Sequence, residues 1–140
     1  MVDFRPILQD IIAMAQQEPD KGKVADYIPQ LEHVNPNKFG ISILGSDGTI
    51  HSDGDAKERF SIQSISKVLL LSMAFGLEGN KLWDRVDVEP SGDPFNHLSL
   101  LEMENGIPRN PLINAGAIVV CDVLISHLKN PKQEFLDYVR

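Results

Sequence analysis

The first hydrophobic positions of the chain follow a helical period. They fall on one stripe of an α-helix: Ile7, Leu8, Ile11, Ile12 and Ala15. Pro19 and Gly22, in the stretch QQEPDKG that follows, end this pattern. The sequence therefore predicts an amphipathic helix, and after it a helical turn in KVADYIPQL that ends at Pro29.

An alternating pattern follows in FGISILGSDGTIHSDGD, residues 39–55. Ile41 and Ile43 alternate with small or polar residues, as in a strand with one buried face. The dipeptide Asp47-Gly48 favours a tight turn between two strands. The segment is predicted to form two antiparallel strands, and RFSIQ, residues 59–63, a short third strand.

Two long apolar runs predict buried helices. Residues 65–77 are apolar nearly all round and are predicted to form a helix closed by Gly76 or Gly79. Residues 114–128 predict a second buried helix, which the sequence KNP stops. Between the two runs, Pro, Gly and Asn are dense enough to predict loops around one short helix near residues 98–104.

A final helix is predicted to open with Asn130 as its cap and Pro131 at its first position. Its apolar residues have helical spacing and are left without a partner: Phe135, Leu136 and Val139. This unpaired face, and a hairpin with open edges, favour the first part of a larger α+β unit. With 140 residues and 42% hydrophobic content, a single domain over residues 1–140 is expected.

Charge and hydropathy narrow the classes of function. The formal net charge of −7 argues against binding to nucleic acid or to anionic membranes. No apolar run approaches the roughly 20 residues that cross a bilayer, and MVDFRPILQD lacks the order of a signal peptide. A cytoplasmic location is therefore expected. Cys121, in AIVVCDVLI, is expected to be an unreactive core residue.

The strongest candidates for chemistry are Ser64 and Lys67, in ERFSIQSISKVLLLSMAFGL. A lysine three residues after a serine lies on the same helix face, so its amine can take the proton of the serine. Ser64 also lies where free backbone N–H groups and the positive pole of the helix can stabilise an oxyanion. Burial beside the leucines that follow favours the neutral amine, which is the form that accepts a proton.

The spacing alone leaves a structural interpretation open. The same spacing recurs at Ser126 and Lys129, where a lysine at a helix end only complements the negative pole. At the first site, Ser61 or Ser64 could cap the helix while Lys67 extends to solvent. Position within the helix favours chemistry at the first site over the second.

Other polar groups are weaker candidates. Asp53 and Asp55 have the rhythm of a calcium loop, but Lys57 at the next ligand position favours a solvated turn. The four histidines lack the spacing of metal ligands. Asn110 and Asn114 bracket PLI before a helix, where an amide can cap the helix or bind a polar substrate.

Several sequence blocks together resemble one family. GKVADYIPQL, FSIQSISKVL, RVDVEPSGDPFN and GIPRNPLINAGAIVVCD are similar, in this order, to the serine-dependent glutaminases. The resemblance covers nearly the whole chain, and each block is more specific than the spacing of one serine and one lysine. It implies an α+β fold of the β-lactamase/transpeptidase type, incomplete here, with an N-terminal hairpin and several helices.

The resemblance also implies an activity and a site. The family hydrolyses L-glutamine to L-glutamate and ammonia without metal or organic cofactor. By resemblance Ser64 is the nucleophile and a substrate ligand, and Lys67 is its base. Asn114 matches an asparagine that binds substrate, and Tyr27 matches a tyrosine of the same pocket. Gln63 is expected to border this pocket.

Members of the family are considerably longer than this chain, and their later half completes the pocket. The chain alone is therefore expected to be weakly active and poorly stable. Family resemblance implies a homo-oligomer, a tetramer. Two alternatives stay open: a non-catalytic fragment that binds glutamine or associates with subunits, and a penicillin-interacting hydrolase, which the lack of an export signal disfavours.

Overall fold

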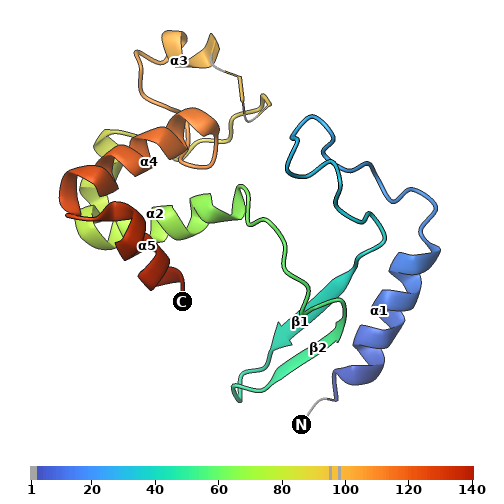
Figure 1. Ribbon diagram of the computed structural model, residues 1–140. Coiled ribbons are helices and arrows are strands. Elements are labelled where there is room, and N and C mark those ends of the chain that lie inside the picture. The colour runs from blue at the N-terminus through green and yellow to red at the C-terminus, as the bar shows by residue number, and fades with distance from the viewer. Residues whose placement is uncertain (1–2, 95, 98) are drawn as a thin grey trace. The chain divides into compact units, whose positions relative to one another are not determined.

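The computed structural model describes residues 3–94, 96–97 and 99–140. The chain separates into two compact units, Met1–Phe60 and Ser61–Arg140 (Figure 1). Most contacts fall within one unit or the other, so each is described by itself. The expected single domain over residues 1–140 stays a prediction.

The first unit consists of one helix and a β-hairpin (Figure 1). Helix α1 (Arg5–Gln17) buries Leu8 and lies against the hairpin, with the Ile12 side chain beside Gly54. Strands β1 (Gly40–Leu44) and β2 (Ile50–Gly54) pair antiparallel, with Gly40 opposite Gly54. Both predictions, the amphipathic helix and the hairpin, are confirmed.

Two smaller predictions are wrong. Residues 59–62 form no strand, and the sheet of the described residues contains only β1 and β2. β-propensity produces a strand only where a neighbouring strand is present, and here the backbone turns towards a helix instead, with Ile65 N donating to Ile62 O at 3.0 Å. The turn at 26–34 also continues past Pro29 rather than ending there.

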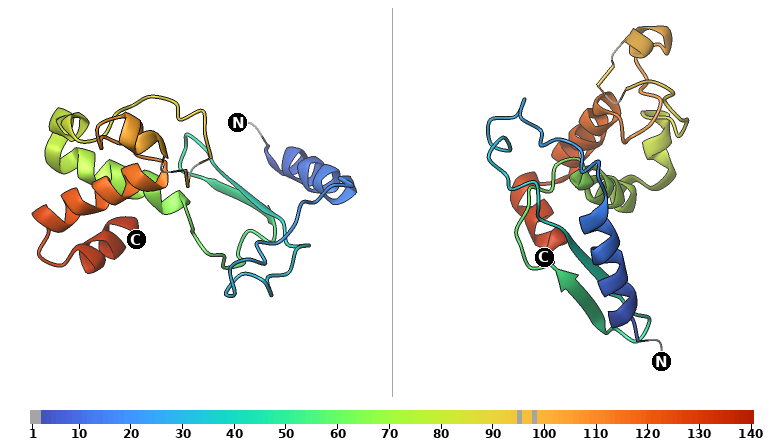
Figure 2. Two further views of the ribbon diagram at one scale, coloured as in Figure 1. Left: turned by 90° about the horizontal axis from the view of Figure 1, so that it is seen from above. Right: turned by 90° about the vertical axis from the view of Figure 1, so that its right-hand side faces the viewer.

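The second unit is helical (Figure 2). Its elements are, in chain order, α2 (Ile65–Glu78), the 3₁₀-helix η1 (Gly79–Asp84), α3 (Ser99–Met103), α4 (Asn114–His127) and α5 (Pro131–Val139). α2 lies against α4, η1 and α5. Buried apolar side chains form the core: Ala74, Leu82, Val86, Val120, Val123 and Leu124. The contact between α2 and α4 therefore organises this unit.

The predicted helices of the second unit are confirmed in their positions. Gly79 closes α2 with a φ of 57°, which glycine adopts without strain. Position 98 of the short predicted helix lies outside the described residues. At α5 the Asn130 side chain accepts from Gln133 N, and Asn130 N donates to Glu134 Oε1 at 2.8 Å. These two bonds form a reciprocal cap.

The two long helices, predicted to be buried, are only partly buried. On α2, Val68 is 56% exposed, and on α4, Ile118 is 68% exposed. Each of these helices buries one stripe, along the side where α2 and α4 meet. No helix among the described residues is long and apolar enough to span a bilayer.

Candidate active site

Ser64 lies immediately before α2, with a φ of −68° and a ψ of −6°. Its side chain makes no capping hydrogen bond, and the residue is exposed. Backbone groups close the first turn instead, since Lys67 N donates to Ser64 O at 3.1 Å. The structural interpretation in which the Ser64 hydroxyl caps the helix is therefore wrong.

Gln63 gives the turn before Ser64 its shape. Its φ is 46°, in the left-handed region that residues with a side chain rarely adopt. Its carbonyl oxygen accepts from Ser66 N at 3.2 Å and from the Ser66 hydroxyl at 2.7 Å. Its amide Nε2 donates to Ser61 Oγ at 2.9 Å. These bonds hold the turn that carries Ser64, while the expected place of Gln63 at a substrate pocket stays a prediction.

Lys67 is partly buried and does not extend to solvent. Its Nζ donates to Asn114 Oδ1 at 2.7 Å and to the carbonyl oxygen of Leu112 at 2.9 Å. Both acceptors belong to the start of α4, whereas Lys67 belongs to the first turn of α2. The amine is thus held between two helix starts, one turn after Ser64.

Asn114 is the first residue of α4, and Ile113 stands at the capping position before it. The side-chain oxygen of Asn114 is directed to Lys67 rather than to the backbone of its own helix. The other end of the amide, Nδ2, is a donor that can bind an oxygen of a polar ligand. The structure therefore brings Lys67 and Asn114 into contact, and Ser64 lies one helical turn before Lys67.

Asn110 caps the turn before α4. Its Oδ1 accepts from Leu112 N at 2.9 Å and from Ile113 N at 3.1 Å. The sequence allowed this amide to cap the helix or to bind a polar substrate. The structure shows its side chain hydrogen-bonded to the backbone before the helix. The Leu112 carbonyl, which contacts Lys67, carries no sequence signal, because every residue has the same backbone oxygen.

Tyr27 belongs to the first unit and lies in the turn at 26–34, where it is 78% exposed. Among the described residues of that unit, no side chain forms a hydrogen bond or a ring contact with Tyr27. Its role in a substrate pocket stays a prediction.

The second serine and lysine pair behaves as the sequence predicts for a helix end. Ser126 lies in the last turn of α4 and Lys129 beyond its last residue, His127, and both are exposed. Cys121 is partly buried, and this burial raises the pKa of its thiol. Among residues 3–94, 96–97 and 99–140, no three His, Cys, Asp or Glu side chains form a group that could hold a metal ion.

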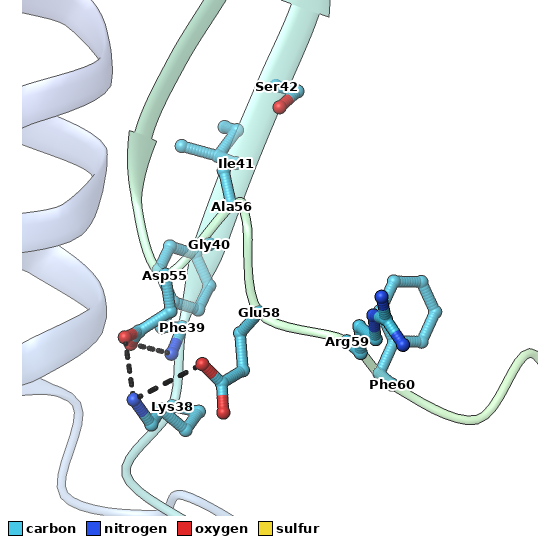
Figure 3. A pocket seen from close by; sticks show the side chains of 10 residues that line it. All are labelled: Lys38, Phe39, Gly40, Ile41, Ser42, Asp55, Ala56, Glu58, Arg59 and Phe60. Carbon is cyan, nitrogen blue, oxygen red and sulfur yellow. Dashed lines mark hydrogen bonds and ion pairs between the residues drawn. The ribbon is translucent and has the colours of Figure 1, made fainter.

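A separate pocket of about 370 Å³ lies in the first unit (Figure 3). Lys38 Nζ there donates to Asp55 Oδ1 at 3.1 Å, and Phe39 N donates to Asp55 Oδ2 at 3.0 Å. The bond from the Phe39 N–H and then the bond from Lys38 hold the pKa of Asp55 below its usual value of 3.8. These bonds join the residues before β1 to the turn after β2, so Asp55 stabilises the open end of the hairpin.

Comparison with known proteins identifies the family of the chain. The glutaminase family model matches residues 22–140. A glutaminase of Christiangramia forsetii is 53% identical over 139 residues, which are 99% of this chain and 46% of that protein. The chain thus spans under half the length of this curated relative.

Solved structures give the same result for the fold. A probable glutaminase, YbaS, superposes with a TM-score of 0.84 at 33% identity, over 98% of this chain and 46% of that one. A probable glutaminase from Bacillus subtilis, complexed with 6-diazo-5-oxo-L-norleucine, superposes with a TM-score of 0.72 at 36% identity, over 97% and 40%.

The chain belongs to the glutaminase family. Its α+β architecture, a two-stranded hairpin with several helices, is part of the β-lactamase-like fold of these enzymes, as the sequence predicted.

Proposed function

We propose that this chain carries the nucleophile and base of a glutaminase, which hydrolyses the side-chain amide of L-glutamine through an acyl-enzyme. The observation that carries the proposal is the placement of the Lys67 amine. Its Nζ is held by Asn114 Oδ1 and by the Leu112 carbonyl, while the Ser64 hydroxyl one turn earlier makes no cap. Family membership supports glutamine as the substrate.

Ser64 and Lys67 together carry out the bond changes and proton transfers of the proposed reaction. Neutral Lys67 accepts the proton of Ser64 Oγ, and that oxygen bonds to the amide carbon of the substrate. The proton then passes to the leaving nitrogen, the carbon–nitrogen bond breaks, and ammonia departs. Water attacks the ester on Ser64 and releases glutamate. The nucleophile is regenerated in this last step.

Two further groups of the site have roles in the proposal. The backbone N–H of Ser64 has no acceptor among the described residues, and we propose that it donates to the oxyanion of the tetrahedral intermediate. Asn114 uses its oxygen for Lys67 and keeps its Nδ2 donor for the substrate. Tyr27 is proposed to line the same pocket.

Ammonia release from glutamine tests the proposal on the purified chain. The wild-type chain is expected to release ammonia slowly, because its relatives are longer. S64A is expected to fall by at least about 10²-fold, the size of effect that loss of a nucleophile or base has. S126A removes the serine of the duplicate spacing and is expected to match the wild type.

Equal rates for the wild type and S64A would overturn the assignment of Ser64. Binding of glutamine without any turnover would favour the alternative, a non-catalytic fragment that binds glutamine or associates with subunits. A homotetramer and a cytoplasmic location also stay predictions, which light scattering and cell fractionation can test.

A further inference from the structure

We propose that Asn110 and Gly116 are positioning residues that fix the two acceptors of Lys67. Their role in catalysis rests on the proposed function, whereas their positions relative to Lys67 are defined by contacts within the second unit. Lys67 Nζ bonds to the Leu112 carbonyl and to Asn114 Oδ1. Each of these acceptors lies close in sequence to one of the two proposed residues.

Asn110 fixes the Leu112 carbonyl. Its Oδ1 accepts from Leu112 N at 2.9 Å and from Ile113 N at 3.1 Å, which fixes the peptide group that contains that carbonyl and the peptide group before it. Its Nδ2 donates to Glu89 O at 2.9 Å, which ties the turn to a neighbouring segment. The Asn110 side chain thus makes hydrogen bonds within the turn and to the segment that contains Glu89.

That neighbouring segment is itself fastened beside the turn. Asp87 N donates to Pro108 O at 2.8 Å, and Glu89 N donates to Arg109 O at 2.9 Å. The bond from Asn110 to Glu89 continues this ladder by one residue. The turn before α4 therefore rests on a short paired stretch and not on the Asn110 side chain alone.

Gly116 fixes the same turn against the helix that carries Asn114. A Cβ built on Gly116 would lie 1.9 Å from the carbonyl oxygen of Asn110 and 2.7 Å from its carbonyl carbon. The backbone of the turn thus touches the first turn of α4 at a place that only glycine permits. A side chain at 116 would push the backbone of Asn110 and Pro111 away from α4, and with it the turn that carries the Leu112 carbonyl.

Both residues act on the amine through its acceptors, which separates them from Ser64 and Lys67. Displacing either the Leu112 carbonyl or Asn114 Oδ1 would let the Lys67 side chain take other rotamers. When a base is displaced by about 1 Å, the reaction rate falls by about 10²-fold. The pair therefore holds the base within reach of the nucleophile.

Brief acetylation with acetic anhydride, followed by peptide mass spectrometry, measures the state of Lys67 without any turnover. Exposed Lys129 is an internal standard in the same molecule. We expect Lys67 to react more slowly than Lys129 in the wild type. In N110A the Lys67 to Lys129 ratio should rise about fivefold, the factor expected for the loss of one hydrogen bond.

Matched variants separate positioning from general damage. G116A should raise the ratio as N110A does, whereas G76A should not, because a Cβ at Gly76 on α2 meets nothing within 4 Å. N110D keeps an oxygen that accepts from the two N–H groups but loses the donor to Glu89 O, so its ratio should lie between those of the wild type and N110A. A folded N110A or a folded G116A with the wild-type ratio would overturn the proposal.

Hydrogen exchange in the wild type decides the matter if N110A does not fold. The N–H groups of Leu112 and Ile113 should exchange at least about tenfold more slowly than in an unstructured chain. Unprotected exchange at both would overturn the proposal. Because neither readout needs ammonia release, failure of the glutaminase activity and failure of this positioning give different results.

Discussion

Lys67, through its side-chain amine, is the residue on which the candidate site depends. Two acceptors from the start of α4 hold it, and they belong to a segment more than 40 positions further along the chain. A lysine that only complemented a helix would not need such partners, as the exposed Lys129 shows. The contacts thus separate two serine and lysine pairs that have the same spacing.

Replacement of Lys67 by methionine removes the base and keeps most of the side-chain volume. K67M should lower ammonia release by at least about 10²-fold, since no amine remains to take the proton of Ser64. Its free energy of unfolding should stay within about 1 kcal/mol of the wild type, because water can reach the two released acceptors. Denaturant titration checks this, with K129M as the control. A fully active K67M would contradict the role of base.

Asp55 makes the stability of the first unit depend on pH. Its pKa is lowered in the folded chain, mainly by the Phe39 N–H, so folding favours the ionised carboxyl. This stabilisation is complete above the unfolded value of 3.8 and is lost as the pH falls through the lower folded value. D55N should therefore be less stable than the wild type at pH 7, and this difference should shrink below pH 3.8.

Thermal unfolding followed by circular dichroism between pH 2 and pH 7 measures this difference. D10N, at an exposed aspartate of α1, serves as the control. A difference between D55N and the wild type that grows as the pH falls would contradict the argument.

The candidate site could be predicted from the sequence only where side chains carry the chemistry. Ser64, Lys67 and Asn114 stand in specific sequence blocks, and the structure shows the contact between Lys67 and Asn114. The Leu112 carbonyl could not be predicted, because a backbone oxygen leaves no mark in the sequence. Gly116 did leave a signal, a glycine inside an apolar helix, but its meaning depends on the contact with Asn110.

At the scale of elements, the starts of α2 and α5 are built differently. Ser64 occupies the capping position of α2 without a capping bond, whereas Asn130 caps α5 with its side chain. A hydroxyl engaged in a cap would be less available as a nucleophile. The start of α2 is held instead by the turn around Gln63, which leaves the hydroxyl of Ser64 for other partners.

Alanine at the two capping positions should therefore have different effects. N130A should speed hydrogen exchange in α5 and cost about 1 kcal/mol, as the loss of a side-chain cap does. S64A should change the free energy of unfolding by less than about 0.5 kcal/mol, because it removes no cap. Equal losses in the two variants would contradict the assignment of the caps.

The elements themselves were predictable where a period was long or a turn was specific. Helix α1 and the hairpin follow from regular spacing and from the Asp47-Gly48 turn. Residues 59–62 misled, because their composition suits a strand but their backbone leads into α2. Helix η1 was not predicted, because Gly79 indicated the end of the preceding helix and because 3₁₀-helices are too short to show a hydrophobic period.

Within each of the two units, the described residues bury few large apolar side chains. In the second unit one cluster of buried apolar side chains lies between α2 and α4, and in the first unit Leu8 is the large side chain buried on α1. Large apolar side chains are exposed on several elements, among them Val68, Ile118 and Ile125. Exposed apolar surface on this scale is typical of a chain that needs further contacts.

The purified chain should therefore be weakly stable and should bind a hydrophobic dye. Fluorescence of 8-anilinonaphthalene-1-sulfonate should rise on mixing with the native chain, since the dye reports accessible apolar surface. Light scattering on the same sample shows whether self-association covers that surface. A monomer that binds no dye and unfolds only at high denaturant would contradict this expectation.

Covalent trapping tests the central claim most directly, because it needs one reaction event and no turnover. 6-Diazo-5-oxo-L-norleucine is an alkylating analogue of glutamine. The proton of the nucleophile passes to the diazo carbon, dinitrogen leaves, and the nucleophile bonds to that carbon. Cys121 is the competing nucleophile, and C121S removes it. Peptide mass spectrometry then locates the adduct.

One adduct is expected on Ser64 in the wild type, in C121S and in S126A, with much slower labelling in K67M and none in S64A. An adduct that persists in S64A at the wild-type rate would contradict the role of Ser64 as nucleophile.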